Sequence, residues 1–319
     1  MQQIELERRF YENNIPTFPK KQICSINWNN YVTNLFPAPD RLFEQGTSPN
    51  YLKPGNELSA NLTCPDLTNV TENTAPVYAS IVDTEASIQR TAALLGVNQT
   101  DIQKKPSAND TEKYTTYSFP GGEFTLEEDT GYVMYNTNSS EMSAYDESFF
   151  PSDDRIREIV RDRLQTVLPD EAGTVNIEVS SSSGWDGSNN GVKYKTAHIH
   201  PTVDGKEVYG VYRIQISFDK DCNVVGLHLL YNPVELKTTV PLKDKTAVQT
   251  MLDKKDYSMD AAEELQNYAL SSTELAFYMD ADVNEDGNFF MYPVFVLHGQ
   301  GTNSDGNAQR FDVIVDAVK

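Results

Sequence analysis

Residues 210–218 read Gly210-Val211-Tyr212-Arg213-Ile214-Gln215-Ile216-Ser217-Phe218, with apolar and polar side chains in alternation from residue 212 onward. Successive side chains of a β-strand point to opposite faces, so this pattern predicts one strand over 208–218 with a buried face. A turn is predicted at 219–223, and 224–231 predicts the strand that returns beside the first. The segment therefore predicts an antiparallel sheet.

Amphipathic helices are predicted ahead of each group of strands. Apolar residues recur at helical spacing over 83–95, 152–168 and 243–252. Strands are predicted after the first helix at 114–119, 123–127 and 132–137, after the second at 174–179, 193–200, 208–218 and 224–231, and after the third at 273–279, 289–297 and 310–318. We therefore expect an α+β protein of repeated units, each a helix packed on an antiparallel β-meander.

The same pattern divides the chain into three parts. Residues 1–77 contain many Pro, Asn and Gly residues and little periodicity, which predicts an irregular N-terminal arm or cap. Residues 78–145 are expected to form the first helix-plus-meander unit. Residues 146–319 are expected to form two further helix-plus-sheet units, which together make the C-terminal domain.

The charge of the chain limits its partners. The net charge is −21, from 47 acidic and 26 basic residues, and such a surface repels phosphate backbones and anionic lipid head groups. No segment is apolar enough to cross a membrane, and the start at Met1 lacks the regions of a signal peptide. We expect no nucleic acid partner, and contact with a membrane only through an anchor that this chain lacks.

The sequence around the quoted strand also resembles that of a known protein family. The spacing over 205–220 is similar to that of PepSY-like proteins. The segments 241–252, 275–278, 292–295 and 311–318 resemble the end of the YycH/YycI-type extracellular proteins and related lipoproteins of low-GC Gram-positive bacteria. The resemblance covers 78–319 and implies a tethered extracytoplasmic protein without catalysis of its own, in a family whose members restrain sensor kinases or peptidases.

From this resemblance we expect a non-enzymatic, monomeric protein associated with the cell envelope. It would bind and modulate another envelope protein through its sheet surfaces, without a cofactor. The sequence contains no nucleophile elbow, no recognisable Cys/His signature and no phosphate-binding loop. Two alternatives stay open: a surface lipoprotein that binds a ligand or glycan, and a calcium-stabilised surface module.

Three histidines are candidates for a zinc site. His198 and His200 are two residues apart on a predicted strand, so their side chains point the same way. His228 lies on another strand of the same predicted sheet and could supply a third ligand. The alternative is that these are exposed strand histidines, since no further ligand lies at close spacing.

Residues 282–287 resemble the start of a calcium loop. Asp282, Asn284 and Asp286 occupy the first, third and fifth positions, and Gly287 the sixth. The twelfth position is Pro293, which has no carboxylate, and the flanking residues predict strands. A hairpin turn is the alternative interpretation.

Two further features concern loops. Trp185 lies in the polar segment 180–191, where it could anchor a peptide, glycan or partner protein, or fold back onto the sheet edge. Cys24 and Cys64 both lie in the N-terminal segment, where a disulfide between them would tie down a long loop. The alternative is that the three cysteines, Cys222 included, are unreactive thiols. The ligand-binding alternative would use Trp185 together with exposed tyrosines.

Overall fold

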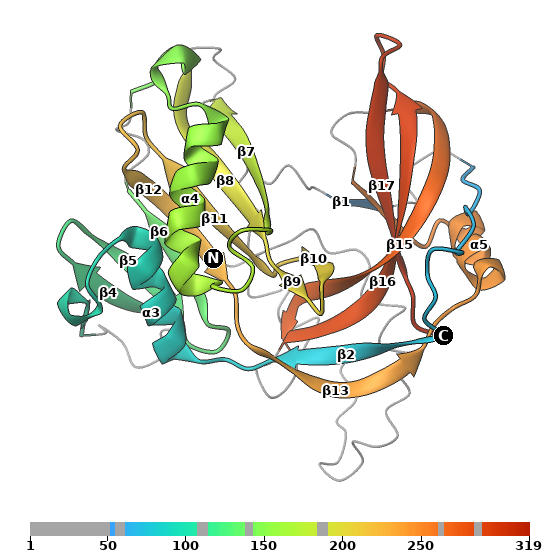
Figure 1. The fold of residues 1–319 in the computed structure, drawn as a ribbon, viewed down its shortest axis with the longest axis horizontal. Coiled ribbons are helices and arrows are strands. Elements are labelled where there is room, and N and C mark those ends of the chain that lie inside the picture. The colour runs from blue at the N-terminus through green and yellow to red at the C-terminus, as the bar shows by residue number, and fades with distance from the viewer. Residues whose placement is uncertain are drawn as a thin grey trace, which may run out of the picture. The chain divides into compact units, whose positions relative to one another are not determined.

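The computed structural model describes residues 52–54, 61–106, 114–137, 143–183, 191–260, 265–283 and 289–319. These residues form mainly β-structure, in one sheet of eight strands and one of nine (Figure 1). The described part of the chain also contains three α-helices, α3 (Thr84–Leu95), α4 (Asp153–Val167) and α5 (Lys245–Lys254). None of its helices is both long enough and apolar enough to cross a membrane.

The eight-stranded sheet is antiparallel throughout. In spatial order its strands are β3 (Gln103–Lys104), β4 (Tyr114–Phe119), β5 (Gly122–Glu127), β6 (Tyr132–Asn136), β12 (Val224–Leu230), β11 (Arg213–Phe218), β8 (Val192–His200) and β7 (Asn176–Ser183). Helices α3 and α4 cover one face of this sheet (Figure 1). Ile156, Val160 and Leu164 of α4 are fully buried there, against strand residues that include Ile199, Ile214 and Ile216.

Helix boundaries follow the predicted caps. Ser152 accepts a hydrogen bond from the backbone N–H of Arg155 at 3.3 Å and so begins α4. Gly96 ends α3 in the left-handed conformation, with φ of 74°. The predicted helix starts and stops are confirmed at both places.

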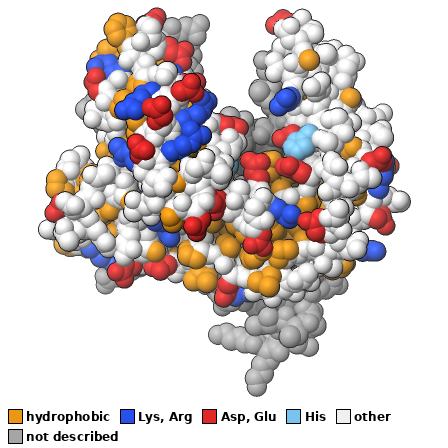
Figure 2. Space-filling model, in the orientation of Figure 1, with side chains coloured by type: hydrophobic (Ala, Val, Ile, Leu, Met, Phe, Trp, Pro, Cys, Tyr) orange, Lys and Arg blue, Asp and Glu red, His pale blue; other side chains and the backbone are white. Residues whose placement is uncertain are grey.

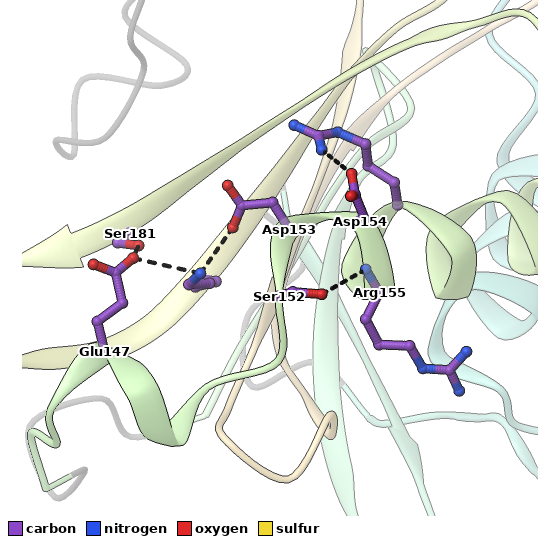
Figure 3. A network of polar contacts seen from close by, with 8 residues as sticks. Glu147, Ser152, Asp153, Asp154, Arg155 and Ser181 are labelled. Atoms are coloured by element: carbon purple, nitrogen blue, oxygen red, sulfur yellow. Dashed lines mark hydrogen bonds and ion pairs between the residues drawn. The ribbon is translucent and has the colours of Figure 1, made fainter.

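A network of charged groups fixes the N-terminal end of α4 to the sheet (Figure 3). The Lys195 ammonium on β8 is buried, and it lies 2.8 Å from Asp153 and 3.4 Å from Glu147. Ser181 on β7 donates a hydrogen bond to Glu147 at 2.6 Å. Because removing a partner from a buried charge is costly, this network holds the helix in one position on β7 and β8.

The nine-stranded sheet is built around three long strands, β15 (Gln266–Val283), β16 (Phe289–Thr302) and β17 (Ala308–Asp316). Its main path is β1 (Leu52–Pro54), β14 (Ser258–Asp260), β17, β16, β15, β10 (Lys206–Gly210) and β9 (Thr202–Val203). The pair β2 (Thr74–Ser80) and β13 (Val234–Pro241) joins this sheet through β16. Val248, Met251 and Leu252 of α5 pack into the core of this sheet.

The strand predicted over 208–218 is wrong in one respect, because it is two strands that lie in different sheets. β10 pairs in parallel with β15, whereas β11 pairs with β8 and β12 in the eight-stranded sheet. The chain changes sheet at Gly210, whose φ is 89°, and the Val211 N–H donates to the Met279 carbonyl at 3.0 Å. A Cβ at position 210 would collide with that carbonyl oxygen, so this crossing requires glycine.

The predicted fold class is also wrong. The elements are not repeated units of a helix on a meander, because each sheet combines strands from different predicted units. The eight-stranded sheet joins β6 of the first predicted unit to β12 of the second, and α5 is the only α-helix of the described residues that packs on the nine-stranded sheet. β2 and β13 were not predicted at all. The boundaries at residues 77 and 145 stay a prediction, and residues 1–51 and 55–60 of the predicted arm lie outside the described residues.

Candidate binding site

A row of polar side chains crosses the face of the eight-stranded sheet that lies opposite α3 and α4. Strand register places Glu178, His198, Gln215 and His228 side by side on β7, β8, β11 and β12. His198 Nε2 lies 2.9 Å from the Ser180 hydroxyl, and the Gln215 amide donates to His198 Nδ1 at 3.2 Å. We call His198, Gln215 and His228, with their partners, the histidine row.

Both histidines of the row are neutral at physiological pH. Burial, with a smaller contribution from His200, lowers the pKa of His198 to about 4. Burial, with the nearby charge of Arg213, lowers the pKa of His228 to about 4. His228 Nδ1 also lies 2.6 Å from the Tyr132 hydroxyl.

The structure does not bring the three zinc candidates together. His198 and His200 share a face of β8 as predicted, but Gln215 lies between His198 and His228. In the described residues, no group of three His, Cys, Asp or Glu side chains is placed to hold a metal ion. His198 and His200 are buried, so the alternative of exposed strand histidines does not describe them either.

Glu178, on the edge strand β7, also lines a cavity of about 610 Å³. We call it the acidic cavity. Its walls come from β7, β8, β10, β15, β16 and β17, and its lining residues are Asn176, Glu178, His200, Glu207, Tyr209, Ser271, Ser272, His298, Gly299, Gln300, Arg310, Phe311 and Asp312. Figure 2 shows acidic side chains beside a histidine at a hollow in the surface.

His200 and Glu207 are the two lining groups with unusual surroundings. His200 is only 9% exposed, and its Nε2 has no hydrogen-bond partner in the described part of the chain. Burial lowers the pKa of His200, although the Glu178 charge opposes this. Burial raises the pKa of Glu207, and the charges of Glu274 and Glu178 raise it further.

The cavity is also lined by a histidine of β16 that lies beside two carboxylates. Strand register sets His298 on β16 directly between Ser272 on β15 and Asp312 on β17. Its Nδ1–H donates to Asp312 at 2.7 Å, and its Nε2 lies 3.6 Å from Glu274. Burial lowers the pKa of His298, but the hydrogen bond and charge of Asp312, with Glu274, outweigh burial and raise it.

The other predicted site residues are not part of this cavity. Trp185, Asn284 and Asp286 lie outside the described residues, as does the side chain of Asp282, whose backbone continues β15. Cys64 is buried and Cys222 is half-buried, whereas Cys24 is not described. The Trp185 anchor, the calcium loop and the Cys24–Cys64 disulfide therefore stay predictions.

Sequence reasoning missed Glu207, His298 and Asp312. Asp312 lies within the predicted strand 310–318, whereas Glu207 and His298 lie just outside the predicted strands 208–218 and 289–297. The local pattern could not show that Glu207 and His298, 91 residues apart in the chain by their numbers, line one cavity. A local indication exists for Asp312, a charged side chain between the apolar residues Phe311 and Val313.

Comparisons with known proteins leave the family open. No family model matches the chain, and no curated protein matches it. An uncharacterized protein from Eubacterium rectale is similar in structure, with a TM-score of 0.46, 12% sequence identity, and coverage of 85% of this chain and 92% of that one. The Bacillus megaterium YpeB C-terminal domain gives a TM-score of 0.33 and 11% identity, over 72% of this chain and 98% of that one.

Both TM-scores lie below 0.5, so neither likeness carries an argument about what this chain does. Membership of the PepSY-like, YycH/YycI-type class therefore stays a prediction.

Proposed function

We propose that the chain is a non-enzymatic extracytoplasmic protein of the PepSY-like, YycH/YycI-type class. It holds another protein of the cell envelope at the acidic cavity and on the sheet surfaces around it. The composition of the cavity is the observation that carries this proposal. Charged and hydrogen-bonding groups from six strands line one space, and Glu178 and Glu207 form no ion pair within the described residues.

The size and polarity of the cavity favour a segment of protein as its occupant. A volume of about 610 Å³ is in the range of ligand sites, but the walls are mostly polar. Small-molecule sites are mainly apolar, whereas the surfaces around a protein interface are polar and wet. Sheet hydrogen bonds fix the backbone that carries these side chains, so the binding surface is formed before the partner arrives.

Site-specific photocrosslinking tests the proposal. A photoreactive amino acid replaces Ser271, an exposed residue of the cavity wall, and the protein is irradiated in the cell envelope of its native organism. The control places the same group at Glu158, which is exposed on α4. We expect one discrete crosslinked protein from position 271 alone, reduced by an excess of unmodified chain. Identical products from both positions, or none, would contradict the proposal.

A further inference from the structure

We propose that the acidic cavity receives a basic side chain of the partner protein, a lysine ammonium or an arginine guanidinium. This inference rests on the proposed function and names the chemistry that the same site recognises. Four features of the site support it. They are the excess of carboxylates over basic groups, the like charges around Glu207, the absence of a hydrogen-bond partner for His200 Nε2, and the lack of a metal ligand set, the last two within the described residues.

The first argument is the charge of the walls. Glu178, Glu207 and Asp312 line the cavity, and Glu274 lies beside it. Arg310, which also lines the cavity, is exposed, and His298 already lies against Asp312 and Glu274. The walls therefore hold more negative than positive charge, and an incoming cation would be attracted.

The second argument is the position of Glu207 on β10. Its carboxylate is half-buried, and the hydrogen bond that it accepts from the Tyr209 hydroxyl is long, at 3.4 Å. Glu274 and Glu178 act on it as like charges, so the ionised form is disfavoured. A cation beside Glu207 would remove this penalty, and binding would gain from that relief.

The third argument is His200. An unsatisfied polar atom inside a protein costs free energy, and a native structure tolerates few of them. His200 Nε2 is such an atom, in a ring that burial keeps neutral. In the tautomer with its proton on Nδ1, this nitrogen is an acceptor. It is almost fully covered, so an ammonium or guanidinium donates an N–H to it after a small rotation of the ring.

The fourth argument separates an organic cation from a metal ion. Zinc sites in proteins need three or more ligand side chains at short range. The described residues bring no three His, Cys, Asp or Glu side chains together in that way. Dispersed carboxylates with one imidazole acceptor suit a group that carries several N–H donors over a larger volume.

Binding of defined peptides tests the inference directly. The probes are short fluorescent Gly/Ser peptides with one central Lys, one central Arg, or one central norleucine, which keeps the apolar stem of lysine but has no charge. Fluorescence anisotropy is measured with the full chain at about 0.15 M ionic strength, where the Debye length is about 8 Å and distant charges are screened. We expect the Lys or Arg peptide to bind about tenfold more tightly than the norleucine peptide.

Matched variants assign the effect to the cavity. Glu207→Gln is expected to weaken binding of the basic peptide about tenfold, while Glu158→Gln on α4 changes it less than about twofold. His200→Phe, which keeps a ring but removes the acceptor, is expected to weaken it several-fold. Near-ultraviolet circular dichroism checks that each variant keeps the parent's packing. Equal binding of Lys and norleucine peptides, or equal effects of the two Glu→Gln changes, would overturn the inference.

A second arm identifies the source of the cation. n-Butylamine, the side chain of lysine alone, is added as a competitor. If it displaces the Lys peptide only at far higher concentration than the peptide needs, the cation belongs to a protein segment. If it competes as well as the peptide, the cation site is supported but the proposed protein partner is contradicted. A crosslinked partner at position 271 together with no preference for basic peptides would contradict the inference alone.

Discussion

The histidine row and the acidic cavity are built from the same kinds of side chain but differ in how these are satisfied. His198 has a partner at each ring nitrogen, and His228 contacts Tyr132. In the cavity His200 Nε2 has no partner within the described residues, and Glu207 faces other carboxylates. Satisfied polar groups stabilise a fold, whereas unsatisfied ones are the groups that a ligand can complete. We therefore assign a structural role to the histidine row and a binding role to the acidic cavity.

Acid should unfold the protein mainly through the histidine row. The folded-state pKa values of His198 and His228 are about 4, below the unfolded value of about 6.5. The unfolded chain therefore binds protons first, and stability is lost as the pH falls from about 6.5 to about 4. Each histidine contributes up to about 3 kcal/mol to this loss.

Urea unfolding over this pH range measures the effect, and His198→Gln isolates it from the background of titrating carboxylates. The variant is expected to lose less stability on acidification than the parent. An unchanged pH slope would show that His198 is not a buried neutral histidine. The chain has four histidines, so their proton resonances in NMR give an independent titration of each.

Gly210→Ala should disrupt the connection between the row and the cavity. Gly210 joins β10, which carries Glu207, to β11, which carries Gln215. Its φ of 89° and the close approach of the Met279 carbonyl both exclude a Cβ, so we expect a loss of about 3 kcal/mol in the free energy of unfolding.

The matched control for this change is Gly205→Ala. Gly205 also has positive φ, at 70°, but a Cβ there would meet no atom within 4 Å. Only the backbone strain applies, so the expected loss is about 1 kcal/mol. Equal losses in the two variants, measured by urea unfolding, would mean that the contact with Met279 is not important.

Much of the local structure could be predicted from the sequence, but the arrangement of the strands into two sheets could not. The alternation over 212–218 and the Ser152 cap are encoded by neighbouring residues, and both appear in the structure as expected. Which strands pair is decided by contacts between distant segments, as between β6 and β12, and no local pattern states it. The crossing at Gly210 was hidden because apolar residues continue on both sides of it, at 208–209 and 211–212.

The candidate site could not be predicted from the sequence for the same reason. His198 and His200 were singled out by spacing, and the structure does place them on one face of β8. Their different roles depend on neighbours that only the tertiary fold supplies, Gln215 for His198 and the cavity for His200. Spacing along a strand predicts the face on which a side chain lies, but it does not show which polar groups have hydrogen-bond partners.

Gln215→Leu should separate the two regions by their readouts. It removes the donor to His198 Nδ1 and leaves a buried acceptor without a partner, at an expected loss of about 1–3 kcal/mol in stability. Binding of the basic peptide should change little, because Gln215 does not line the cavity. The converse change, Glu207→Gln, should weaken binding without loss of stability. If Gln215→Leu weakened peptide binding as much as it lowered stability, the two regions would not be distinct.

The smallest effect on stability is expected at His298, and its pH dependence is opposite in sign to that of the histidine row. Its folded-state pKa is raised above the unfolded value, so the stability it contributes is present below about pH 6.5 and is lost as the pH rises through the folded pKa. The side chain is 35% exposed, so solvent screens the ion pair and the contribution is a few tenths of a kcal/mol. His298→Gln should therefore be slightly less stable than the parent at about pH 5.5 and equal to it at about pH 8.5, in urea unfolding at both values. A loss that grew with pH instead would mean that His298 is a neutral histidine like those of the row, and the contrast between the row and the cavity would lose its electrostatic basis.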